Sequence, residues 1–305
     1  MKDELKRMKA DARETIQPVA DPAKVAGAKS GTPLTAPQSL SAHWPEYLIE
    51  AGCLGTFMLS TCVFSVLLAH PDSPLVVSLS SEGLRRLLGG VAMGLTAVAL
   101  IYSPLGQRSG AHMNPAVTLT FYRLSKMERS DAVFYALFQF LWALARTFLA
   151  YGLLRSALAH ERVGFAITAP RPGAEFSAFV WEAVISFVLM TAILNFSNRV
   201  VLARYTGVVA GFLVMLFITL ESPISGMSMN PARSFATDFV GMRWRGLWIY
   251  FVAPAAGMLA AAELYVRMRG FHSVICAKLN HSGSARCIFR CGYMSMPVAA
   301  NSPEG

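Results

Sequence analysis

Two copies of one short pattern constrain the fold of this chain more than any other feature. Ser109–Leu119 reads SGAHMNPAVTL and Ser225–Phe235 reads SGMSMNPARSF, so both contain Ser-Gly and, two residues later, Met-Asn-Pro-Ala. Upstream of each copy a glutamate, Glu50 or Glu182, opens an apolar stretch. Internal repetition of this kind indicates two structurally related halves.

The apolar residues gather in blocks long enough to cross a lipid bilayer. The chain is 54% hydrophobic and 15% charged, whereas soluble proteins carry about 25% charged residues. A spanning helix needs about 20 mostly apolar residues. Six blocks are candidates, the fifth of them short: Tyr47–Ala69, Leu84–Ser103, Ala132–Leu154, Phe176–Phe196, Tyr205–Leu220 and Leu247–Val266. Three blocks accompany each copy of the pattern, and this odd number predicts that the halves have opposite orientations, as in an inverted repeat.

Each Asn-Pro-Ala triplet carries the residues that begin a helix. Asn114 and Asn230 are of a type preferred as helix N-caps, and proline is favoured at the first helical position, where its missing N–H is not needed. The predicted helices, about Pro115–Leu124 and Pro231–Val240, are too short to span a bilayer. Because irregular backbone at membrane depth must be buried or line a watery cavity, we expect two half-helices that meet at a pore.

The meeting point of these half-helices has a predictable electrostatic character. Their N-termini carry partial positive charge. With the asparagine side-chain oxygens used as caps, we expect the amide NH2 groups to be free to point into the pore. Such a site offers hydrogen-bond donors to water and repels cations, protons included.

These features resemble the major intrinsic protein family, the aquaporins and glycerol facilitators, and are closest to its aquaporin-like members. The resemblance covers about Glu46–Met268. It implies an all-α membrane protein, an inverted repeat with six transmembrane helices and two re-entrant half-helices, usually a homotetramer. It also implies a passive channel for water that can admit small uncharged solutes and excludes protons and ions, and it implies neither an enzyme nor a required cofactor. The alternatives are a glycerol or small-polyol facilitator, and a gated or sensing membrane protein controlled by its C-terminal tail.

The resemblance also assigns roles to single residues. Glu50 and Glu182 would support the re-entrant loops by accepting backbone hydrogen bonds, with proton transfer as the weaker alternative, and His112 would lie at the inner pore mouth. The paired pore motifs are Asn114, Pro115 and Ala116, and Asn230, Pro231 and Ala232. The selectivity constriction would consist of Met93, Ile218, Met227 and Arg233.

This ring fits neither familiar subclass. Water-selective members usually carry a Phe and a His there, and glycerol facilitators a Trp, a Gly and a Phe. Met93 depends on the alignment, because strict spacing from Asn114 would select Gly94 instead. The ring is therefore expected to be more apolar than a strict water filter, while Ser234 and the pair Tyr250-Phe251 favour water over glycerol.

The remaining sequence is expected to form two tails around a channel domain at residues 44–268. Residues 1–43 are predicted to be disordered and cytoplasmic, with a partner-binding arm as the alternative, and residues 269–305 to be a cytoplasmic tail. The net charge of +9 reflects basic residues in tails and loops on one side, which favours cytoplasmic termini over nucleic-acid binding. We expect a multi-pass protein of the plasma (cell inner) membrane.

The C-terminal tail contains a group of metal-ligand residue types. Cys276, His281, Cys287 and Cys291 match a structural zinc site in ligand type and number, although the spacing is not that of a standard zinc finger, and His272 is an alternative ligand. Unpaired thiols in a disordered tail are the competing interpretation, followed by redox sensing or lipidation. A cytoplasmic location argues against structural disulfides.

Overall fold

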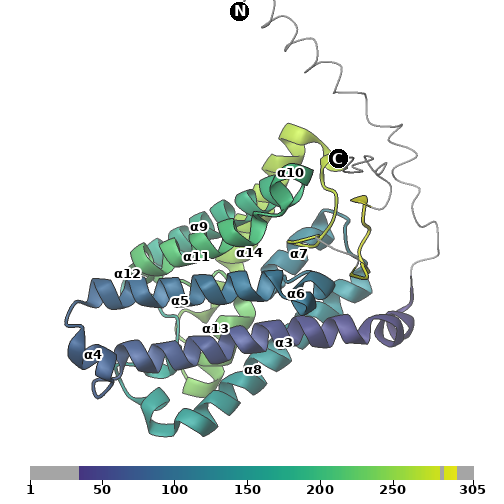
Figure 1. The fold of residues 1–305 in the computed structure, drawn as a ribbon. Coiled ribbons are helices and arrows are strands. Elements are labelled where there is room, and N and C mark those ends of the chain that lie inside the picture. The colour runs from purple at the N-terminus through teal and green to yellow at the C-terminus, as the bar shows by residue number, and fades with distance from the viewer. Residues whose placement is uncertain (1–33, 282–284, 294–305) are drawn as a thin grey trace, which may run out of the picture. The chain divides into compact units, whose positions relative to one another are not determined.

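The computed structural model describes residues 34–281 and 285–293, and within these ranges helices are the only regular secondary structure (Figure 1). Five helices are long and apolar enough to cross a membrane: α3 (Ala36–Ala69), α5 (Glu82–Tyr102), α8 (Arg129–Ala159), α9 (Glu175–Ser197) and α14 (Leu247–Arg269). The fifth expected block forms the shorter apolar helix α11 (Thr206–Leu220). All six apolar blocks are therefore helical.

The Asn-Pro-Ala triplets begin the half-helices, as expected. These are α7 (Pro115–Arg123) and α13 (Pro231–Gly241), which end within one residue of the predicted positions. Short helices complete the connections: α4 (Pro74–Ser78), α6 (Pro104–Ser109), α10 (Val200–Ala203), α12 (Ser222–Ser225), and the 3₁₀ turns η1 (Gly164–Ala166) and η2 (Phe271–Ser273).

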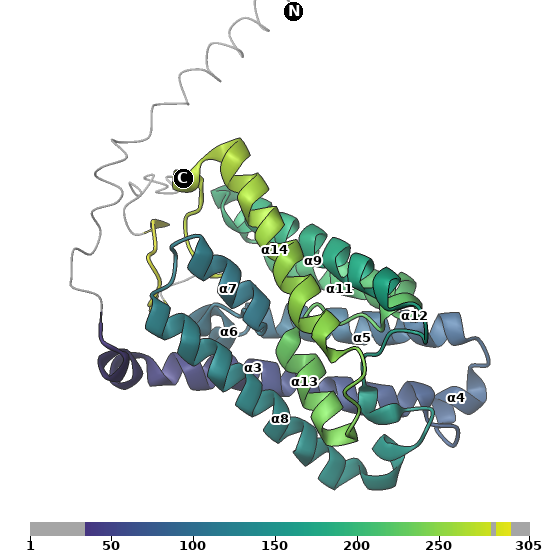
Figure 2. The same ribbon diagram turned by 180° about the vertical axis from the view of Figure 1, so that it is seen from behind.

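The helices pack in the same way in the two halves. In the first half α3 packs on α8, and in the second half α9 packs on α14, while α5 and α11 join the halves. The half-helices α7 and α13 both contact α8 and α14, and they also contact each other (Figure 2). Large apolar side chains such as Leu95, Leu141 and Phe212 remain exposed on the spanning helices, which suits contact with lipid.

The contact between α5 and α11 depends on glycine. A Cβ atom on Gly94 would lie 2.6 Å from the carbonyl oxygen of Gly211, and a Cβ on Gly211 would lie 2.6 Å from that of Gly94. Small residues allow membrane helices to approach this closely. The helix that carries Met93 is thus held directly against the helix that carries Ile218.

The ends of the channel domain differ from the sequence expectation. Helix α3 begins at Ala36, where Gln38 Oε1 accepts a hydrogen bond from the backbone N–H of Thr35 (2.9 Å), so the folded part starts before the expected boundary at residue 44. Of the predicted N-terminal tail, residues 1–33 lie outside the described residues.

The C-terminal segment also differs from the expected separate tail. Residues 274–280 are all buried against the channel domain. Their apolar members, Val274, Ile275 and Leu279, together with Phe289, are buried there. Four apolar side chains spread through a polar stretch give little signal in an averaged composition, and for this reason the packing was not expected.

Candidate pore and the segment at its end

The two re-entrant loops are held by buried carboxylates. Glu50 accepts hydrogen bonds from the backbone N–H of Met113, from Ser109 Oγ (2.8 Å) and from Gln139 Nε2 (2.9 Å). Both Glu50 and Glu182 are fully buried. Hydrogen bonds to a buried charged acceptor are about twice as strong as neutral ones, so the carboxylate fixes the loop.

Glu182 repeats this arrangement in the second half. Its carboxylate accepts hydrogen bonds from Ser225 Oγ (2.8 Å) and from the backbone N–H groups of Ser228 (2.7 Å) and Met229 (2.8 Å). The carboxylate oxygens of Glu50 and Glu182 all accept hydrogen bonds from donors. None of these donor groups is a base that could take up a proton. The geometry fits support of the loop rather than proton transfer.

The loop backbones share an unusual conformation. In the first loop, Gly110, Ala111 and Met113 have φ angles of 103°, 54° and 48°. In the second loop the equivalent Gly226, Met227 and Met229 have φ angles of 88°, 51° and 55°. Left-handed φ values are costly for residues other than glycine and persist only where the surroundings impose them. The glutamate hydrogen bonds supply that constraint.

The two asparagines cap their helices and also join the two loops. Asn114 Oδ1 accepts from Ala116 N (2.8 Å), and Asn230 Oδ1 accepts from Ala232 N (3.1 Å). Each amide nitrogen donates to the opposite loop: Asn114 Nδ2 to the Met229 carbonyl (2.7 Å) and Asn230 Nδ2 to the Met113 carbonyl (2.6 Å). The expectation of wholly free NH2 groups is therefore corrected. An amide NH2 carries two donors, and one is used in each crossing bond.

A cavity of about 750 Å³ runs past both asparagines. At one end it is lined by Arg85, Arg86 and Arg162, and at the other by Ile101 and Leu279. We call the second end the tail-side mouth, because Leu279 belongs to the C-terminal segment. The residues expected to form the constriction all line this cavity: Met93, Ile218, Met227 and Arg233. His112 and Ala111 also line it.

The structure distinguishes the two candidates for the α5 position of the ring. Met93 lines the cavity, whereas Gly94 packs against the backbone of α11. Thr61 Oγ1 approaches Met93 Sδ at 3.9 Å. Consecutive helical residues point about 100° apart, so only one of the two can face the lumen, and that residue is Met93.

Arg233 lines the cavity, and one of its guanidinium nitrogens, Nη1, is buried without a hydrogen-bond partner among the described residues. A buried donor without a partner costs about 1 to 3 kcal/mol, and more when it is charged.

His112 is covered as well as lining the cavity. Its Nδ1 atom lies 3.0 Å from Thr118 Oγ1, and its Nε2 atom lies 2.7 Å from the carbonyl oxygen of Ala277, in the C-terminal segment. The ring of Phe289 stacks on the imidazole, with centroids 5.6 Å apart and planes 17° apart. The residue expected at the inner pore mouth thus contacts the C-terminal segment on two sides.

A pair of tyrosines supports the loops, and the sequence reading missed this role. Tyr135 donates from its hydroxyl to the Ser109 carbonyl (2.7 Å), and Tyr250 donates in the same way to the Ser225 carbonyl. Both are fully buried. An alignment of the third and sixth apolar blocks would have revealed this pair. Tyr135 follows Asn114 by 21 positions, and Tyr250 follows Asn230 by 20.

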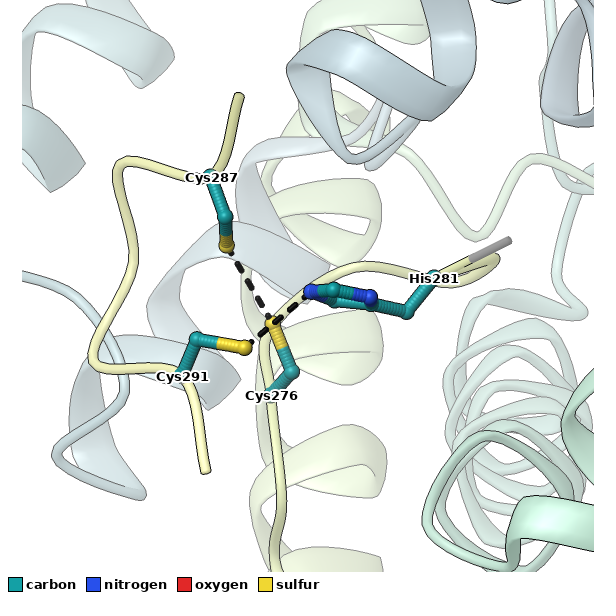
Figure 3. Close-up of side chains that lie close together, drawn as sticks. All are labelled: Cys276, His281, Cys287 and Cys291. Carbon is teal, nitrogen blue, oxygen red and sulfur yellow. Dashed lines mark hydrogen bonds between the residues drawn. The ribbon is translucent and has the colours of Figure 1, made fainter. Parts of the chain in front are cut away.

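Four metal-ligand side chains of the C-terminal segment converge (Figure 3). One ligand atom from each of Cys276, His281, Cys287 and Cys291 lies within 4.8 Å of the others. Cys276 Sγ is 3.6 Å from Cys287 Sγ, and Cys291 Sγ is 3.1 Å from His281 Nε2. Hydrogen bonds to Cys287 and Cys291 raise the pKa of His281 to about 9, and hydrogen bonds to Cys276 and Cys287 lower the pKa of Cys291.

A comparison with known protein families agrees with the structure, which has paired loops, a shared cavity and an inverted helix packing. The family model described as "Major intrinsic protein" matches residues 41–265. The chain belongs to the major intrinsic protein family. Members of this family are passive membrane channels, so this chain is a multi-pass channel and not an enzyme.

Named members of the family are similar to the chain over much of its length. "Aquaporin NIP1-1" of Arabidopsis thaliana is 33% identical over 237 residues, which cover 76% of each chain. "Aquaporin NIP1-2" of Arabidopsis thaliana is 36% identical over 189 residues, covering 60% of this chain and 63% of that protein. "Nodulin-26" of Glycine max is 34% identical over 177 residues, and there too the match spans 63% of the relative's length.

A solved structure confirms the fold. The X-ray structure of the aquaglyceroporin from Plasmodium falciparum superposes with a TM-score of 0.59 and 22% sequence identity, covering 73% of this chain and 95% of that one. At this identity the likeness concerns the fold. The predicted all-α, aquaporin-like membrane architecture is thereby confirmed.

Proposed function

We propose that the channel conducts water and small uncharged solutes and excludes ions and protons. The observation that carries this proposal is that Arg233 lines a cavity that also passes Asn114 and Asn230. A solute oxygen can accept a hydrogen bond from each of these donors in turn. The guanidinium charge and the two helix N-termini together repel cations.

The constriction supports a broader solute range than water alone. Met93, Ile218 and Met227 give the proposed ring three apolar side chains against one arginine. An apolar wall provides contact for the carbon atoms of a small polyol or amide, while Arg233 binds its oxygen. Methionine side chains are long and adaptable, so the ring can accommodate solutes of more than one shape. Glycerol as the main solute is the second candidate, and the same apolar wall favours it.

We also propose the assembly and orientation that the family resemblance and the charge distribution support. The channel is a homotetramer in the plasma (cell inner) membrane with both termini on the cytoplasmic side. Arg108, Arg123 and Lys126 lie at the connections on the side of the C-terminal segment, in line with the excess of basic residues on cytoplasmic loops. On this orientation the tail-side mouth is the cytoplasmic one.

Stopped-flow light scattering of proteoliposomes tests the proposal. Vesicles with the full chain, treated with a metal chelator, are mixed in turn with sucrose, glycerol and urea. With sucrose, faster shrinkage than in empty vesicles is expected from water flux. With glycerol or urea, shrinkage followed by re-swelling faster than in empty vesicles would show entry of that solute. Re-swelling with glycerol at a rate that matches water flux would instead favour a polyol facilitator.

A further inference from the structure

The cysteine and histidine cluster of the C-terminal segment lies outside the pore machinery described above. We propose that Cys276, His281, Cys287 and Cys291 bind one zinc ion, and that this ion holds the C-terminal segment across the tail-side mouth as a closed gate. The gating part rests on the proposed function, whereas the zinc site does not.

The side-chain geometry fits a tetrahedral metal site. Structural zinc is bound at about 2.3 Å by cysteine sulfur and about 2.0 Å by histidine nitrogen, so in a tetrahedral site two sulfurs lie about 3.8 Å apart and a sulfur and a nitrogen about 3.5 Å apart. Cys276 Sγ and Cys287 Sγ are 3.6 Å apart, near the sulfur–sulfur distance, and Cys291 Sγ and His281 Nε2 are 3.1 Å apart, shorter than the sulfur–nitrogen distance by about 0.4 Å. A disulfide requires about 2.05 Å between the sulfur atoms. Three thiols and one imidazole, without a carboxylate, select zinc over calcium or magnesium.

The ligands come from two stretches of chain that the ion would tie together. Cys276 and His281 lie on the stretch that follows η2, and Cys287 and Cys291 lie on the returning stretch (Figure 3). Between η2 and residue 292, the described residues contain no helix and no strand. A segment of this kind has few internal backbone hydrogen bonds, and metal binding can supply the missing stability.

The first stretch is hydrogen bonded to the channel domain at the tail-side mouth. Leu279 donates its backbone N–H to the Gly110 carbonyl (3.1 Å), and the Ala277 carbonyl lies 2.7 Å from His112 Nε2. Ile275 donates its N–H to Asn198 Oδ1 (2.6 Å). Gly110 and His112 belong to the first re-entrant loop. The segment therefore attaches to the loop that carries Asn114.

The second stretch is held by a ring contact and by charges. Phe289 is 4% exposed and stacks on His112. Arg290 pairs with Glu128 (2.8 Å) and donates its backbone N–H to the Lys126 carbonyl (3.0 Å). The exposed ion pair contributes little by itself. The buried ring of Phe289, and the hydrogen bonds of Lys278 Nζ to the carbonyls of Ala285 (3.2 Å) and Arg286 (2.8 Å), also hold the stretch.

The segment reaches the lumen through one side chain. Leu279 is 3% exposed and lines the same cavity as Asn114, Asn230 and Arg233. His281 follows Leu279 by two positions in the sequence, and Cys276 precedes it by three. Zinc ligands thus flank the side chain at the mouth on both sides, and on this proposal loss of the ion loosens the segment that carries Leu279.

Metal analysis of the purified full chain tests the site. We expect elemental mass spectrometry to find about one zinc ion per chain. A variant with Cys276, Cys287 and Cys291 all replaced by Ser should contain little zinc. Cys53→Ala is the matched control, because Cys53 is a buried cysteine of α3 outside the cluster, and its zinc content should equal that of the unaltered chain. Absence of zinc from the unaltered chain, or equal zinc in the Ser variant, overturns the site.

Water permeability with and without zinc tests the gate. In proteoliposomes of the full chain, removal of zinc by a chelator should raise permeability about fivefold or more, and added zinc should reverse the rise. Leu279→Ala should raise permeability with zinc still bound, because it shortens the side chain at the mouth and leaves all ligands in place. This variant keeps the test valid where the Ser variant does not fold.

The outcomes separate the gate from the proposed function. Equal permeability with and without zinc, above that of empty vesicles, leaves the channel intact and overturns the gate. Permeability equal to that of empty vesicles in both states overturns the proposed function and the gate together, and the zinc content still decides the metal site.

Discussion

At the scale of single residues, buried charges serve two different purposes in this membrane domain. Glu50 and Glu182 are surrounded by donors from the loops that they hold. Arg233 keeps one nitrogen without a partner and faces the cavity. A charge within the membrane is costly and is retained for structure or transport. Here the first two hold the re-entrant loops, and on the proposed function the third acts on what passes through the pore.

Replacing Glu182 tests the supporting role. The Glu182 carboxylate accepts hydrogen bonds from Ser225, Ser228 and Met229. In Glu182→Gln, the new NH2 group faces at least one of these donors, and that hydrogen bond is lost. We expect a loss of about 2 to 4 kcal/mol in the free energy of unfolding, seen as a lower melting temperature in detergent. Glu175→Gln is the control, because Glu175 pairs with exposed Arg245, and it should melt close to the unaltered chain. A Glu182→Gln variant as stable as this control would contradict the role.

Replacing Arg233 tests the cation barrier. Arg233→Ala removes the positive charge and the donors, and Arg233→Lys keeps the charge. We expect Arg233→Ala vesicles to leak protons faster than those of the unaltered chain, as reported by a pH-sensitive dye inside them. Arg233→Lys should leak little. If both variants leaked equally, the barrier would depend on shape rather than charge.

Residue roles were predictable from the sequence where they depend on short spacing. The caps, the prolines and Arg233 are fixed by the Asn-Pro-Ala strings themselves: the prolines begin α7 and α13, and Asn114, Asn230 and Arg233 line the cavity. The choice between Met93 and Gly94 was not predictable from the sequence. An alignment error of one residue changes the direction of a helical side chain by about 100°. The hydroxyl bonds of Tyr135 and Tyr250 depend on packing between distant helices, which spacing does not report.

At the scale of elements, the apolar blocks gave helix positions to within a few residues in most cases. Hydrophobicity marks the part of a helix in lipid and not its polar ends, so α3 and α8 extend beyond their predicted blocks. The first two turns of α3, which read APQSLSA, are less apolar than the block itself and resemble the tail that precedes them. The close approach of α5 to α11 was also unpredicted, since glycines in an apolar block do not name their partner helix.

Widening the contact between α5 and α11 tests the role of glycine there. A Cβ on Gly211 would lie 2.4 Å from Val98 Cγ2 and 2.6 Å from the Gly94 carbonyl oxygen. Gly211→Val should therefore force the helices apart at a cost of about 1 to 3 kcal/mol, measured as a lower melting temperature and altered water permeability. Gly152→Ala is the control, since nothing lies within 4 Å of the added atom. Equal stability of both variants would contradict close packing.

At the scale of the whole molecule, the pore belongs to both halves. Each asparagine donates to the loop of the other half, so neither half can form the narrow region by itself. The repeat in the sequence predicts this symmetry. The C-terminal segment breaks it, because nothing equivalent covers the opposite end among the cavity-lining residues described. Its position depends on a few apolar side chains and on four ligands brought together by folding, which no single motif reveals.

Water flux through the full chain after zinc removal tests the central claim most directly, because it measures the pore without the proposed gate. Proteoliposomes treated with a zinc chelator are mixed with a sucrose gradient, and their shrinkage is followed by stopped-flow light scattering beside empty vesicles treated in the same way. The account predicts faster shrinkage of the protein-containing vesicles with no faster decay of a proton gradient. Shrinkage at the rate of the empty vesicles would contradict the account.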